Sequence, residues 1–337
     1  MMDWMKLLAP LTKATGISGD EGAVRAAILS LLPEHLTHEI DALGNLIVYK
    51  PGKSRELLLL SAHMDEPGLL VETADEKGGL RFTCAGEIDE RVLAGRQVWV
   101  HTNERAIPGV IGVKPVHVIS SKERETAVEA DDLFIDIGCK KKEEALQLVQ
   151  PGDSVTFDGD LIPFGDNLLR GRALESRTGC ALLIELLRSE EIFPCDIAAV
   201  FTTQRRTGSA GMKTAAFALQ PKAAVILEAA PSAFGTDSPA LSKGAVLTLK
   251  EKRGFYDRDA YRAALETAKK LELPVQQKTG AFDASDAAAA QLAGKGCPTL
   301  ELGIPTRNTG TPCCIQSVAD LDSVYRLLCA LVREDKL

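Results

Sequence analysis

Short apolar runs alternate with helical patterns over most of this chain. The run at 57–62 holds four consecutive leucines and ends in His63 and Asp65. It is too short to span a membrane and is typical of a strand buried on both faces. Further strand-like runs lie at 197–203, 223–227 and 299–303, and helical patterns at 179–187, 211–219, 284–292 and 318–332. This alternation predicts an α/β fold with a mainly parallel sheet flanked by helices.

The N-terminal segment begins with a helical pattern over residues 3–32, and a strand-like run follows at 45–49. Ser18 is followed by Glu21 three residues later, just before an apolar helical stretch. This spacing predicts a capping box that begins the second helix.

The pattern changes between residues 72 and 160. Short strand-like runs recur at 97–100, 109–113, 133–137 and 154–157, and only 142–149 looks helical. Closely spaced strands with turn residues between them predict a small β domain inserted into the larger one. We therefore expect one domain made of residues 1–71 and 161–337, and an inserted β domain at 72–160.

Charge and composition exclude several kinds of partner. The 337 residues include 39 basic and 47 acidic side chains, a formal charge of −8, which argues against a nucleic-acid surface. No apolar run approaches the roughly 20 residues of a spanning helix, and the first residues lack a signal-peptide pattern. We therefore expect no membrane partner. Eight cysteines occur without any Cys-x-x-Cys pair, so we also expect reduced thiols and a cytoplasmic location.

Polar residues follow several of the predicted strands. In an open α/β sheet, ligands bind beyond the carboxyl ends of the strands. Beyond the end of the 57–62 run, His63 and Asp65 hold the positions of a metal ligand and of the carboxylate that orients it. A lone histidine at a strand end is otherwise a simple cap. A metal site therefore requires further ligands at the ends of other strands. The other polar residues at strand ends and in nearby loops are Glu175, Arg205, Arg206, Glu228 and the loop that contains Gly310.

Nucleophilic alternatives have weaker support in the sequence. Ser61, Ser176 and Ser209 lack the Gly-x-Ser-x-Gly arrangement of a nucleophile elbow. A dyad of His63 with Cys313 or Cys314 is a further alternative, but packed or incidental thiols are the favoured interpretation.

Several motifs, taken together, identify a family resemblance over nearly the whole chain. They are SAHMDEPG at 61–68, RALESRTGC at 172–180, QRRTGSAG at 204–211 and GIPTR at 303–307. In this order they resemble the cobalt- or zinc-dependent glutamyl/leucyl aminopeptidases that assemble into tetrahedral particles, relatives of which are often labelled endoglucanases. The resemblance implies hydrolysis of the N-terminal residue of peptides by two metal ions, and homo-oligomers from dimers to dodecamers.

The resemblance also implies where the site residues stand. Such enzymes use five protein ligands and a glutamate as general base. His63 keeps its ligand role and Asp65 its orienting role. The remaining positions are changed: Glu175 stands at that of the bridging aspartate, Arg205 at that of the base, Arg206 at that of a ligand glutamate, Glu228 at that of a ligand aspartate and Gly310 at that of the last ligand histidine.

These changes predict a degenerate metal site. Arginine stays protonated and has no lone pair for a metal or a proton, and Gly310 offers only backbone. We therefore expect no cofactor, with one zinc or cobalt ion held by His63, Asp65 and Glu228 as the alternative. We also expect at least one of the two arginines to pair with Glu175, Glu228 or Asp65, because guanidinium groups suit carboxylates.

Two functions of different classes remain open at this point. The first is a structural, regulatory or peptide-binding homologue, which forms homo-oligomers or co-assembles with an active paralogue. The second is an active aminopeptidase or other hydrolase with a rearranged one-metal or metal-free site.

Overall fold

The structure of this chain is a computed structural model that describes residues 2–115, 117–118, 120, 125–233, 238–252, 254–278 and 285–337. It divides into two units. One comprises Met1–Asp65, Asp160–Thr309 and Cys313–Leu337, and the other Glu66–Gly159 and Gly310–Pro312. Each unit has a hydrophobic core of its own.

The larger unit is built on an 11-stranded sheet. Nine strands follow the order β1-β2-β12-β3-β13-β18-β19-β11-β10, and β14 pairs with β17 and β18 off this path. Their bounds are β1 Thr37–Ile40, β2 Leu46–Lys50, β3 Ser54–His63, β10 Ile162–Phe164, β11 Leu168–Gly171, β12 Cys195–Thr202, β13 Ala223–Ser232, β14 Ala245–Thr248, β17 Val275–Lys278, β18 Thr299–Arg307 and β19 Cys314–Ser317. Strands β15 (Lys250–Glu251) and β16 (Gly254–Phe255) form a separate two-stranded sheet.

Parallel pairing is concentrated in the centre of this sheet. Strands β12, β3, β13 and β18 run parallel to one another, whereas β2, β14 and β19 pair with this centre in the antiparallel direction. The α/β class is confirmed, with the sheet mixed at its margins. The outer strands β1 and β2 are joined by a short connection, which suits antiparallel neighbours.

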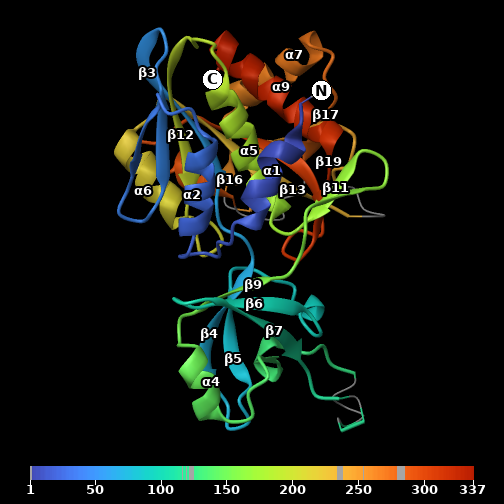
Figure 1. The fold of residues 1–337 in the computed structure, drawn as a ribbon. Coiled ribbons are helices and arrows are strands. Elements are labelled where there is room, and N and C mark those ends of the chain that lie inside the picture. Colours follow the sequence, from blue (N-terminus) through green and yellow to red (C-terminus); the bar gives the residue numbers. More distant parts are fainter. Residues whose placement is uncertain are drawn as a thin grey trace. The chain divides into compact units, whose positions relative to one another are not determined.

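Helices cover both faces of the sheet (Figure 1). One face carries α1 (Trp4–Lys13), α2 (Gly22–Leu31), α5 (Leu174–Arg188), α7 (Arg258–Lys270) and α9 (Val318–Glu334). The other face carries α6 (Ala210–Leu219) and α8 (Asp286–Gln291). Ala284, the first residue of one predicted helix, lies outside the described residues. None of the helices in the described parts of the chain has the length and apolar character needed to cross a membrane.

The leucine run of β3 shows why a continuous apolar pattern suits a central strand. Leu58 and Leu60 belong to the core on the α5 face, and Leu59 belongs to the core on the α6 face. All three are at most 1% exposed. Full burial of such a side chain contributes roughly 1.5–3 kcal/mol, so this strand holds the two helical layers on the sheet.

The smaller unit is a closed six-stranded barrel in the order β4-β5-β8-β7-β6-β9 (Figure 1). The strands are β4 Gly68–Ala74, β5 Leu80–Ala85, β6 Gln97–His101, β7 Ala106–Gly112, β8 Phe134–Asp136 and β9 Ser154–Phe157, and the helix α4 spans Lys142–Leu148. The predicted β character of this region is confirmed. Strand β4 spans the predicted boundary at 71/72.

The predicted capping box at Ser18 and Glu21 is wrong. Helix α2 begins at Gly22, and Glu21, its N-cap, makes no side-chain cap hydrogen bond. Ser18 Oγ instead donates to the Asp65 carboxylate at 2.5 Å, and Glu21 accepts from the backbone N–H of Gly19 and Gln204. Ser18 thus binds the buried Asp65 carboxylate, and Glu21 binds the loop that contains Gln204, instead of capping α2.

Candidate active site at the ends of the parallel strands

His63 and Asp65 belong to a buried polar cluster at the end of β3. His63 is the last residue of β3, and the two side chains are 2% and 0% exposed. The distance from His63 Nδ1 to Asp65 Oδ1 is 3.2 Å. Asp65 also accepts from the backbone N–H of Arg205 at 3.1 Å and of Arg206 at 2.9 Å. Asp65 therefore orients the imidazole and holds the loop that follows β12.

Glu228 lies between His63 and Arg205. It belongs to β13, with a side chain that is 7% exposed. Its Oε2 lies 3.2 Å from Arg205 Nε, and its Oε1 lies 3.4 Å from His63 Nε2. Burial alone would raise the pKa of Glu228, but the charges of Arg205 and His63 outweigh burial and lower it to about 2.

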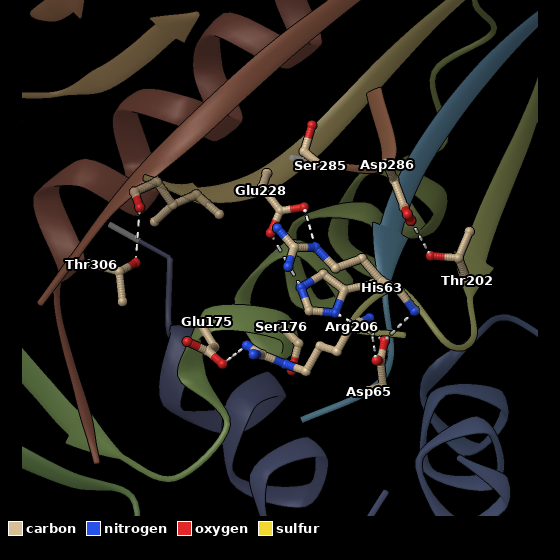
Figure 2. Close-up of polar contacts among 12 residues, drawn as sticks. His63, Asp65, Glu175, Ser176, Thr202, Arg206, Glu228, Ser285, Asp286 and Thr306 are labelled. Atoms are coloured by element: carbon tan, nitrogen blue, oxygen red, sulfur yellow. Dashed lines mark hydrogen bonds and ion pairs between the residues drawn. The ribbon is translucent and has the colours of Figure 1, made fainter. Parts of the chain in front are cut away.

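The second ion pair joins Arg206 to Glu175. Glu175 lies in the first turn of α5, and the Arg206 guanidinium contacts its carboxylate through Nη2. The two side chains are 7% and 2% exposed. Figure 2 shows Arg206 extended toward Glu175 while His63 and Glu228 face each other. The expected pairing of the arginines with nearby carboxylates is thus confirmed for both residues.

Gly310 offers no side chain to the cluster, and the Cys314 thiol lies near the Glu175 carboxylate. Gly310 has a left-handed φ of 70° and carries no side chain to offer a metal. The Cys314 thiol donates to the Asn308 carbonyl at 3.4 Å and lies 3.8 Å from Glu175 Oε2. A thiol that faces a carboxylate has no help toward deprotonation, so these contacts favour packing over a His63–cysteine dyad.

Two members of the cluster were missed by sequence reasoning. Asp286, the first residue of α8, is 1% exposed and accepts from Thr202 Oγ at 2.6 Å. Burial, together with the nearby charge of Glu228, raises its pKa. The available signal was one carboxylate in an otherwise alanine-rich stretch. Ser18, the other member, was assigned to a cap instead.

Basic side chains face the buried carboxylates of this cluster. Burial disfavours a charged His63, but Glu228 and Asp65 outweigh it and raise the pKa of the imidazole. His63 and the two arginines then face Asp65, Glu175 and Glu228, and Asp286 adds a fourth carboxyl group, whose pKa burial raises. Ion pairs this deeply buried persist only where each charge has its partner.

These residues do not fit a dinuclear metal centre. Guanidinium groups lie against Glu175 and Glu228, and they have no lone pair for a metal and repel cations. Among the described residues, no three histidine, cysteine, aspartate or glutamate side chains are grouped so as to hold a metal ion. The chemistry of the donor set therefore opposes the two-metal arrangement that the family resemblance implies.

This cluster predicts a dependence of stability on pH at both ends of the range. The raised pKa of His63 stabilises the fold fully below its unfolded value of 6.5, and that contribution is lost as pH rises through the folded value. The lowered pKa of Glu228 contributes above 4.5 and is lost as pH falls toward 2. Urea unfolding between pH 3 and 9 measures both changes. His63→Gln should remove the alkaline decline, and an unchanged decline would contradict the assignment.

Comparison with known proteins places the whole chain in one group. A family model described as M42 glutamyl aminopeptidase matches residues 44–327. A putative aminopeptidase of Acetivibrio thermocellus is 30% identical over 331 residues, covering 97% of each chain.

Solved structures agree with this match over the full length. A TET aminopeptidase from a marine-sediment Thaumarchaeota archaeon is 27% identical with a TM-score of 0.94, covering 100% of this chain and 98% of that one. The TET1 peptidase of Pyrococcus horikoshii, which can assemble into a tetrahedron or a large octahedral shell, is 32% identical with a TM-score of 0.90, covering 98% of this chain and 100% of that one.

Proposed function

Because this chain belongs to the M42 glutamyl aminopeptidase family, we propose that it is an aminopeptidase homologue whose metal site has been replaced by ion pairs. Its role would be structural, regulatory or peptide-binding. The observation that carries this proposal is the pairing of Arg206 with Glu175 and of Arg205 with Glu228 inside the buried cluster. The expectation that no metal cofactor is bound belongs to the same proposal.

The general-base position supports the same interpretation. Arg205 stands where the family resemblance places a glutamate that accepts a proton from water. A nearby carboxylate raises the pKa of its guanidinium still further. A group that remains protonated at every physiological pH accepts no proton, so the ordinary aminopeptidase mechanism has no base here.

Assembly is the second part of the proposal. The Pyrococcus horikoshii relative forms closed shells, and we propose that this chain likewise forms homo-oligomers or joins an active paralogue. The inserted domain at 72–160 would take part, within a chain organised as residues 1–71 with 161–337. A cytoplasmic location completes the proposal, supported by eight free cysteines.

An active hydrolase with a rearranged site is the second candidate function. The family match favours it, and so does one atom of the site. His63 Nε2 is buried and lies 3.4 Å from Glu228 Oε1, but among the described residues it makes no contact with hydrogen-bond geometry. A single zinc or cobalt ion on His63, Asp65 and Glu228 would use that atom.

Metal content and turnover separate the two candidates. If ion pairs have replaced the metals, we expect purified protein to contain less than stoichiometric zinc or cobalt. Added metal should leave the melting temperature unchanged, and a panel of aminoacyl substrates should show no turnover. The measurements are elemental analysis, thermal unfolding with and without metal, and release of the N-terminal residue.

The His63→Ala variant is the control for these measurements. Stoichiometric metal together with turnover that disappears in His63→Ala would overturn the main proposal and establish the second candidate. Metal that binds equally well to His63→Ala would be bound elsewhere on the protein and would leave the main proposal standing.

A further inference from the structure

A groove crosses the outer wall of the barrel, which belongs to a different unit from the polar cluster at the ends of the parallel strands. It has a volume of about 280 Å³. Residues of strands β6 and β7 form most of its lining. The side chains that matter for its chemistry are Gln97, Trp99, Pro108, Val110, Asp136 and Asp158.

The strand register explains why these side chains share one surface. Trp99 lies opposite Pro108, and Gln97 lies opposite Val110. Val110 in turn lies opposite Asp136 on β8. Directly paired residues point to the same face of a sheet. In a closed barrel, the face that is not packed in the core faces solvent, and Trp99 and Val110 are accordingly 37% and 45% exposed.

The indole of Trp99 is held in place at one end of the groove. Its Nε1–H donates to Asp158 Oδ1 at 3.1 Å. Asp136 similarly uses Oδ1 to accept the backbone N–H of Gly138 at 2.8 Å. The second oxygen of each carboxylate has no hydrogen-bond partner among the residues that the structure describes. Each of the two carboxylates therefore offers one such oxygen to the groove.

Charge in the groove has one sign only. Among its lining residues, all of which the structure describes, there are two carboxylates and no lysine or arginine. An exposed indole beside carboxylates attracts organic cations, because the ring face and the carboxylate oxygens both interact favourably with positive charge. The apolar floor of Pro108 and Val110 suits the methylenes that carry such a charge.

We propose that this groove binds the side chain of a lysine presented on the surface of a peptide or protein partner. The aliphatic stem lies over Pro108 and Val110, against the Trp99 ring, and the ammonium group interacts with both Asp136 and Asp158. The groove is open along an exposed barrel wall, so a side chain enters without any rearrangement of the strands. This inference is independent of whether the polar cluster of the larger unit is catalytic.

The test uses the full-length protein and the fluorescence of Trp99. The chain has two tryptophans, and Trp4 is only 2% exposed, so an external ligand changes the emission of Trp99. The probe is Nα-acetyl-lysine methylamide, and the comparison is Nα-acetyl-norleucine methylamide, which has a similar stem without the charge. We expect a saturable change with the lysine probe, and at least about fivefold weaker binding of the norleucine compound.

Matched variants separate charge from shape. Asp136→Asn should weaken lysine binding about fivefold. It is the cleaner variant, because Asp158 also holds the indole. Glu72→Gln, which removes an exposed carboxylate on β4 outside the groove, should leave binding unchanged. Equal binding of the lysine and norleucine compounds, or no effect of Asp136→Asn, would overturn the proposal. Binding of the free diamine cadaverine without binding of the lysine probe would also overturn the assignment to a lysine side chain.

Discussion

Arg206→Ala is expected to lower the free energy of unfolding by about 3–5 kcal/mol, because removal of one partner leaves the other charge buried. Arg206 and Glu175 are 7% and 2% exposed and in direct contact. Water cannot readily solvate the remaining Glu175 carboxylate, so its desolvation is no longer offset by the guanidinium. Urea unfolding at pH 7 measures the change.

Two further variants test whether this loss comes from removing the guanidinium beside Glu175. Arg91→Ala, which breaks an exposed pair with Asp89, should leave stability almost unchanged. The double variant Glu175→Leu/Arg206→Met should recover most of the stability lost in Arg206→Ala, because apolar residues of similar volume replace a buried pair at little cost. A double variant as unstable as the single one would show that the loss comes from packing instead.

Restoring the family's residues at the changed positions is expected to create metal binding and turnover together. The variant combines Glu175→Asp, Arg205→Glu, Arg206→Glu, Glu228→Asp and Gly310→His. Carboxylates and imidazole supply the lone pairs that guanidinium groups lack, and a bound divalent ion generates a nucleophile from water at neutral pH. Elemental analysis should find about two metal ions per chain, with release of N-terminal residues from peptides.

A version of this variant that retains Arg205 is the matched control. It should bind metal similarly, but its turnover should be about 10²–10⁴-fold lower, because the general base is absent. Gly310→His carries a cost of its own, since φ at this position is 70° and a side chain in that region costs about 1–3 kcal/mol. A five-residue variant that folds and still binds no metal would contradict the assignment of these positions.

Much of the larger unit could be predicted from the chain itself. Central parallel strands are apolar on both faces, so 57–62, 197–203 and 223–227 were recognisable without any partner. The flanking strands were harder. Strand β1 is exposed at all four positions, which removes the apolar signal. Strands β10, β11 and β19 are held by pairing with one another and with β18, which a local pattern cannot express.

Prediction of the barrel from the sequence is limited in the same way by non-local strand pairing. Strands β6, β7, β8 and β9 were expected from short apolar runs, but β4 and β5 were not. Closure of the six strands depends on pairs far apart in sequence, such as β4 with β9 and β6 with β9. Non-local pairing of this kind is set by the tertiary structure.

The sequence by itself determined the family, the α/β class and the residue types in the cluster. Arg205 and Arg206 cannot bind a metal in any fold, because a guanidinium has no lone pair to give. Only the tertiary structure decided which charges meet: Arg206, in the turn after β12, contacts Glu175 in α5, and Glu228 contacts both Arg205 and His63. It also brought Ser18 to Asp65 and Asp286 to Thr202. Those two contacts join residues 47 and 84 positions apart in the chain. Burial then decides which of the available partners a charge must take.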